Sequence, residues 1–102
     1  MDRIIELVDV VRREVVGYNT RGFKSRSVFL ENAAEQRFCI VVVPDYEPGQ
    51  RRRSTVMVMA VVQGEYIVIE EDTTDRPLWE ALVRAGIPRD RIVLAYAGES
   101  AP

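Results

Sequence analysis

Hydrophobic residues recur at the spacing of an α-helix in two parts of the chain. Residues 2–16 carry a broad apolar stripe opposite a polar side, which is typical of an amphipathic helix. The stripe is formed by Ile4, Leu7, Val8, Val11 and Val15. A second helix is predicted over residues 75–85, with Thr74 as its N-cap and Gly86 just beyond its last turn. Pro77 fits such a helix because N–H groups of the first turn have no helical partner.

Short apolar runs bounded by turn-forming residues predict strands between and after these helices. Five such runs lie at residues 27–31, 36–43, 54–62, 65–71 and 91–96. Gln63 and Gly64 are expected to form a two-residue hairpin turn, since glycine accepts the positive φ that such turns require. The order α-β-β-β-β-α-β predicts an α+β fold with a largely antiparallel five-stranded sheet and two helices.

Two of the predicted strands are apolar at consecutive positions. Residues 38–43 and 55–62 lack the alternation expected of a sheet with one solvated face. Two helices can cover one face of a five-stranded sheet, so the other face would need a partner, most simply a second copy packed sheet against sheet. The residues expected at that interface are Phe38, Ile40, Val42, Met57, Met59 and Val61. The alternative is that the two helices straddle both faces of the central strands.

The overall composition is that of one small globular domain spanning residues 1–102, with 47% apolar and 29% charged residues. Charges interrupt the first apolar stretch, and no run approaches the roughly 20 apolar residues that span a bilayer. Cys39, the single cysteine, cannot form an internal disulfide and is expected to be a small buried hydrophobe. A cytoplasmic location is therefore expected.

Charge is unevenly distributed along the chain. Residues 1–53 hold ten basic and eight acidic side chains, whereas residues 54–102 hold four basic and eight acidic ones. The main basic cluster is Arg51, Arg52 and Arg53, which Arg21, Lys24 and Arg26 can extend. Clustered arginines bind nucleic-acid phosphates by releasing counterions. The same cluster also suits a solvated hairpin end that protects strands from aggregation.

The sequence lacks the side chains that common catalytic sites need. It has no histidine, which removes Ser-His and Cys-His nucleophile pairs, and one cysteine is too few for a common zinc site. An acidic cluster is formed by Glu70, Glu71, Asp72 and Asp75. Carboxylates of this kind can bind magnesium or calcium, but a strand end and a helix start also favour acidic residues. We therefore expect no catalytic residue, metal or cofactor.

Two segments of the chain carry recognisable motifs, residues 64–74 (GEYIVIEEDTT) and 82–94 (LVRAGIPRDRIVL). These segments resemble the XisI family, whose members are called excision controlling factors. They match a family pattern of hairpin, strand, Asp-x-Thr, helix and Ala-Gly-Ile-Pro-x-Asp-x-Ile-Val-Leu. The matching residues occupy capping and turn positions, and they are Asp72, Thr74, Gly86, Ile87, Pro88 and Asp90. The chain departs from the family after Leu94 and lacks a histidine common in its third strand.

The resemblance implies a non-enzymatic regulator of the programmed excision of a DNA element. It implies that such a protein works beside a recombinase and a companion similar to nucleases, through protein–protein contacts. One alternative is a direct DNA-binding module that uses the basic cluster at residues 51–53. Another is a metal-dependent enzyme centred on Glu70 and Asp72.

Overall fold

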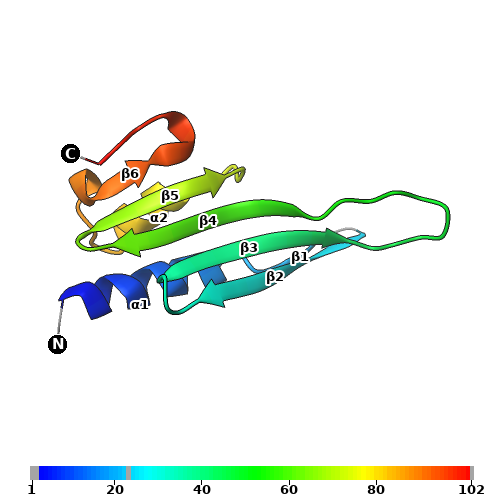
Figure 1. The fold of residues 1–102 in the computed structure, drawn as a ribbon, viewed down its shortest axis with the longest axis horizontal. Coiled ribbons are helices and arrows are strands. Elements are labelled where there is room, and N and C mark those ends of the chain that lie inside the picture. The colour runs from blue at the N-terminus through cyan, green and yellow to red at the C-terminus, as the bar shows by residue number, and fades with distance from the viewer. Residues whose placement is uncertain (1–2, 23, 102) are drawn as a thin grey trace.

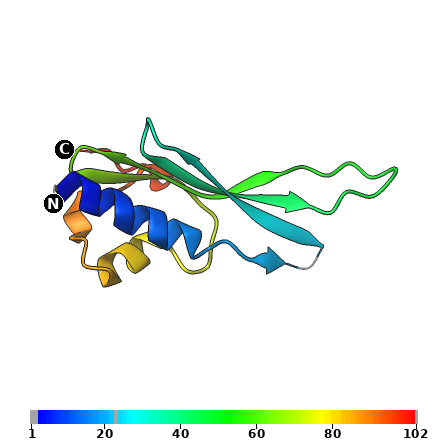
Figure 2. The same ribbon diagram turned by 90° about the horizontal axis from the view of Figure 1, so that it is seen from below.

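The chain forms one sheet with both of its helices against the same face. The structure, a computed structural model, describes residues 3–22 and 24–101. Helix α1 (Arg3–Val16) and helix α2 (Leu78–Arg84) lie on one side of a six-stranded sheet, as Figure 1 and Figure 2 show. The predicted α+β class is confirmed, but the sheet has six strands instead of five. The helices do not straddle the sheet.

The strands follow one another across the sheet in chain order. They are β1 (Arg21–Gly22), β2 (Ser25–Asn32), β3 (Arg37–Pro44), β4 (Thr55–Gln63), β5 (Tyr66–Asp72) and β6 (Ile92–Leu94). Neighbours from β1 to β5 pair antiparallel, and β6 joins β5 in parallel after the α2 crossover. Strand β1 was not predicted. Single-turn 3₁₀ helices, η1 (Arg89–Arg91) and η2 (Ala95–Ala97), flank β6.

The hydrophobic core fills the space between the sheet and the helices. Val11 and Val15 of α1 are fully buried, as the helical stripe predicts. They pack with residues of four strands and of α2, among them Phe38, Ile40, Val58, Ala60, Ile67, Ile69, Leu78 and Leu82. Full burial of each large aliphatic or aromatic side chain contributes roughly 1.5–3 kcal/mol. Asp2 and the side chain of Ile4, which the sequence placed in this helix, lie outside the described residues.

The hairpin turn and the start of the second helix each lie one to three residues from their predicted positions. Gln63 pairs with Tyr66, so the hairpin turn is Gly64-Glu65, with Gly64 at φ +62°. Gly takes the first central position, as type II′ geometry requires. Helix α2 begins at Leu78, and Thr74 is not its N-cap. Pro77 precedes the first helical residue instead of lying within the first turn.

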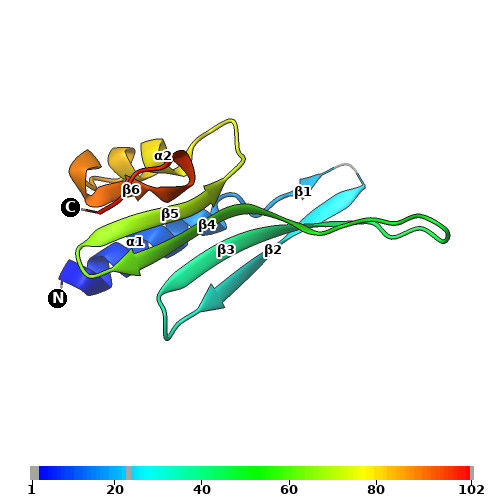
Figure 3. The same cartoon turned by 45° about the horizontal axis from the view of Figure 1, so that its top comes forward.

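A long arm joins β3 to β4. Residues 45–54 form no strand and project from one end of the molecule, which measures 49 × 29 × 24 Å (Figure 3). The hydroxyls of Tyr46 and Ser54 lie 3.3 Å apart across the arm. The arm carries Arg51, Arg52 and Arg53 well away from the two helices (Figure 1). No helix in the described ranges is long and apolar enough to span a membrane.

Candidate protein-interaction surface

The face of the sheet opposite the helices carries apolar side chains that neither α1 nor α2 covers. Phe38 and Ile40 of β3 point toward the helices and are fully buried. Because side chains alternate along a strand, Cys39 and Val41 point to the other face, which we call the open face. Neither α1 nor α2 lies on it (Figure 2).

An apolar patch lies across three strands of the open face. The strand register places its members side by side, and they are Val28, Leu30, Cys39, Val41, Val56 and Met59. Leu30 is 51% exposed, and the other five are partly exposed. Contiguous exposed apolar side chains mark interaction surfaces in soluble proteins. The sequence pattern had indicated an uncovered face of this kind, but of these six residues it had singled out only Met59.

Charged side chains border the patch toward β5. Arg37 lies opposite Val61 and donates a hydrogen bond from Nη1 to Glu70 Oε1 at 2.9 Å. Glu71 pairs in register with Met59, and its side chain makes no ion pair or hydrogen bond with any residue that the structure describes. An apolar centre with a charged rim is the usual anatomy of a protein–protein interface.

The six predicted interface residues do not share one face. Phe38 and Ile40 are buried in the core beneath the helices. Val42 and Met57 also lie on the helix side, where they line a hollow together with Tyr18. Only Met59 and Val61 lie on the open face, and Val61 is just 2% exposed. The predicted set is therefore wrong as a single interface.

A β-bulge explains why the two methionines separate. Ile40 pairs with Val58 and Val41 pairs with Val56, so Met57 is an extra residue in β4. Such an insertion interrupts the two-residue alternation. Met57 consequently packs against the core, whereas Met59 faces outward. Simple alternation in the sequence had placed both on one face.

Burial raises the pKa of the Cys39 thiol, which lies in the apolar patch. The thiolate is the nucleophilic form, so a raised pKa makes the thiol less reactive at neutral pH. The surroundings are Leu30 and Met59, its register partners on either side. Cys39 is thus a partly exposed apolar member of the patch, whereas the sequence had predicted a small buried hydrophobe.

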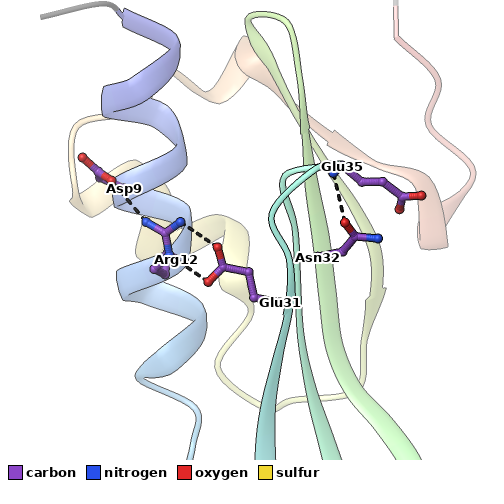
Figure 4. Close-up of polar contacts among 5 residues, drawn as sticks. All are labelled: Asp9, Arg12, Glu31, Asn32 and Glu35. Carbon is purple, nitrogen blue, oxygen red and sulfur yellow. Dashed lines mark hydrogen bonds and ion pairs between the residues drawn. The ribbon is translucent and has the colours of Figure 1, made fainter.

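An ion pair fastens α1 to β2 at the edge of the sheet (Figure 4). Arg12 donates from Nε and Nη2 to the two carboxylate oxygens of Glu31, at 3.1 and 2.7 Å. Arg12 also reaches Asp9 Oδ1 at 3.2 Å, and its guanidinium lies 5.2 Å from the centre of the Phe38 ring. The hydrogen bonds from Arg12 lower the pKa of Glu31.

The predicted basic residues gather at the arm end of the molecule. Arg21 pairs with Arg26 between β1 and β2, and Asp45 N–H donates to the Lys24 carbonyl at the start of the arm. All six predicted side chains are exposed. Lys24 Nζ lies 3.9 Å from Glu47, and Arg52 hydrogen-bonds Gln50. The fold therefore joins two basic segments that are more than 20 residues apart in the sequence.

The residues of the predicted acidic cluster have separate structural roles. Glu70 pairs with Arg37, while Asp72 binds backbone and side-chain groups ahead of α2. In the described ranges, no group of three or more cysteine or carboxylate side chains is arranged to hold a metal ion. The hollow beside this loop, of about 760 Å³, is lined by Glu14, Tyr18, Asp75, Arg76 and Arg84 among others. It contains neither cysteine nor histidine.

The family model for the XisI protein matches residues 1–101. The chain belongs to the XisI family. This confirms the resemblance that residues 64–74 and 82–94 indicated. No curated protein matches the chain.

Two crystal structures of XisI proteins share this fold. A XisI-like protein from Anabaena variabilis ATCC 29413 aligns with a TM-score of 0.78 and 19% identity, over 90% of this chain and 85% of that one. The fdxN element excision controlling factor XisI from the same organism aligns with a TM-score of 0.74 and 17% identity, over 93% of each chain. At these identities the likeness establishes the fold, and the XisI arrangement of helices and sheet is retained.

Proposed function

We propose that the chain is a non-enzymatic regulator that controls excision of a DNA element through contacts with other proteins, in the cytoplasm. Membership of the XisI family supports the excision role, since one relative of the same fold is named as an excision controlling factor. The proposed mode of action rests on the open face, whose apolar patch is covered by neither α1 nor α2. We further propose a nuclease-like companion as one of its partners.

The chemistry of the side chains favours binding over catalysis. The chain has no histidine, and its one cysteine lies in the apolar patch with a raised pKa. The acidic residues are used to pair Arg37 and to order the loop before α2. A flat apolar patch with a charged rim suits a protein partner better than a small substrate, which normally occupies a concave pocket.

Binding and excision assays with open-face variants test this proposal. Val41→Glu places a charge in the middle of the patch, so it should weaken binding of the nuclease-like companion by tenfold or more and lower the excision frequency. Val83→Glu is the matched control, because Val83 is an exposed valine on α2, on the other side of the sheet. Equal effects of the two variants, or no effect of either, would rule out the open face as the contact surface.

A direct role in DNA binding is the second candidate, and one specific observation favours it. The arm and the β1–β2 hairpin bring exposed basic side chains to one end of the molecule. Arg51 and Arg53 make no ion pair with any described residue, so their charges are available to phosphates. Exposed arginines gathered in this way can bind the phosphates of a duplex by releasing counterions.

Salt-dependent DNA binding distinguishes the two candidates. If the arm contacts DNA, duplex affinity should fall steeply between 50 and 200 mM salt, and changing Arg51, Arg52 and Arg53 to alanine should reduce the salt slope by about 3. Arg76→Ala and Arg84→Ala on the α2 side are the control substitutions, each of which removes one positive charge, as each arm substitution does. If DNA binding by the wild-type chain is undetectable or independent of salt, the DNA-binding candidate is excluded and contact with proteins remains as the function.

A further inference from the structure

The outer edge of β6 has no free backbone hydrogen-bonding group. Ile92 N–H donates to the Arg89 carbonyl, and the Ile92 carbonyl accepts from Arg89 Nη1 at 2.8 Å. Leu94 N–H donates to Glu99 Oε1 at 2.9 Å, and the Leu94 carbonyl accepts from Glu99 N–H at 3.0 Å. Arg89 and Glu99 also pair with each other at 3.2 Å. This edge cannot accept another strand.

The opposite edge of the sheet is open along most of β2. Strand β1 covers only its first residues, where Ser27 N–H donates to the Thr20 carbonyl and thus points away from β3. Backbone groups alternate in direction along a strand, so those of Phe29 and Glu31 point outward too. Within the described ranges, no residue pairs with these four N–H and C=O groups. Unpaired groups of this kind are a template for strand addition.

Leu30 lies at the centre of this free stretch. Its own backbone groups face β3, where it pairs with Cys39, and its side chain is 51% exposed on the open face. Natural edge strands are commonly protected by charges, prolines or covering loops. An exposed leucine at a free edge instead favours contact with another strand.

We propose that β2 pairs antiparallel with β2 of a second copy of this chain, with Leu30 opposite Leu30 across the two-fold axis. Phe29 of each copy then pairs with Glu31 of the other, and their outward backbone groups form four hydrogen bonds. The leucine side chains meet at the closely spaced, non-hydrogen-bonded position between these pairs.

The distribution of charge along β2 favours a second copy in this orientation. Arg21 and Arg26 flank the beginning of the strand, whereas Glu31 and Glu35 lie at its end and in the following turn. Antiparallel pairing sets the basic end of one copy beside the acidic end of the other. Parallel pairing would place like charges together.

Glu31 does not prevent the two strands from pairing. In each copy of the chain, Arg12 binds the Glu31 carboxylate of the same chain through two hydrogen bonds (Figure 4). The turn is also ordered, because Glu35 N–H donates to Asn32 Oδ1 at 3.2 Å. Because the β6 edge is closed, pairing ends with two copies. The pairing does not depend on the proposed function, and it leaves both open faces on the same side of one continuous sheet.

Sedimentation analysis of edge variants tests the pairing. The wild-type chain should be a dimer, and Leu30→Lys should raise the dimer dissociation constant at least tenfold, because two ammonium groups would face each other. Val83→Lys is the control, since Val83 is 39% exposed but lies on α2. A wild-type chain that stays monomeric at all concentrations, or a dimer that Leu30→Lys does not weaken, overturns the proposal.

Disulfide trapping tests the register without relying on a destabilising change. In a Cys39→Ser background, Leu30→Cys should form a covalent dimer on oxidation, because facing Cα atoms at this position lie about 4.5 Å apart, within disulfide range. Val28→Cys should not, since its two copies would be offset by about 13 Å along the strands. Equal trapping at both positions, or trapping only at residue 28, overturns the register.

Discussion

Asp72 Oδ2 accepts a hydrogen bond of 2.7 Å from the backbone N–H of Leu78, the first residue of α2. Its other oxygen accepts from Thr74 N–H at 2.9 Å and from the Thr74 hydroxyl at 2.6 Å. The last residue of β5 therefore orders the loop and caps the helix that follows. This is the structural reason for an Asp-x-Thr sequence at the strand end.

Removing this carboxylate should destabilise the fold. Asp72→Ala leaves the backbone N–H groups of Thr74 and Leu78 without their acceptor, and each typically costs about 1 kcal/mol or more, so we expect a loss of about 1–3 kcal/mol in the free energy of unfolding. Urea denaturation measures the loss. Asp75→Ala, an exposed neighbour in the same loop, should change it by less than about 0.5 kcal/mol. Equal losses would mean that Asp72 has no capping role.

Acid should weaken the link between α1 and β2. The pKa of Glu31 is lowered in the fold by Arg12, so the pair stabilises the protein above the ordinary glutamate pKa, about 4.3, and this contribution is lost as pH falls through the lowered value. Melting temperatures of the wild type and Glu31→Gln should differ at pH 7 and converge at low pH. A difference that stays constant from pH 7 to pH 2 contradicts this assignment.

Protection of the outer β6 edge against strand addition should depend on Glu99. Its pKa is lowered, first by the hydrogen bond from Leu94 N–H and then by Arg89. Glu99→Ala should make the Leu94 amide exchange with solvent faster and should produce assemblies larger than a dimer. Hydrogen exchange and light scattering measure the two effects. Glu80→Ala on α2 is the control, and unchanged exchange at Leu94 would show that the side chain does not protect this edge.

The alkylation rate of the Cys39 thiol should show whether a partner covers the open face. Because burial raises its pKa, alkylation should be slower than for a free peptide thiol at pH 8 and should accelerate as pH rises further. A bound companion should slow the reaction again by shielding the patch. Alkylation rates with and without the companion measure this, and a rate that the companion does not alter places the contact elsewhere.

The sequence predicted most elements of the fold because local signals agreed with the packing. Val11 and Val15 lie at helical spacing and are buried, and Gly86 ends α2 with φ +102°. Strand β1 has only two residues, Arg21 and Gly22, and both are exposed, so no hydrophobic pattern marks it. The parallel direction of β6 likewise follows from the α2 crossover and not from its own residues.

The candidate surface was harder to predict than the fold. A face shared by β3 and β4 depends on their register, which is set across a ten-residue arm and includes a bulge at Met57. Alternation within each strand cannot supply that register. The closed β6 edge depends on Arg89 and Glu99, ten residues apart, which only the folded chain brings together.

Because one edge of the sheet is closed and the other is free, the molecule can pair with only one additional strand. A chain with two free edges could polymerise, whereas this one can add one strand and then stop. If that strand comes from a second copy, no other protein can occupy the same position at the same time. Self-association and capture of a foreign strand would then compete, and the concentration of the chain itself would set the balance between them.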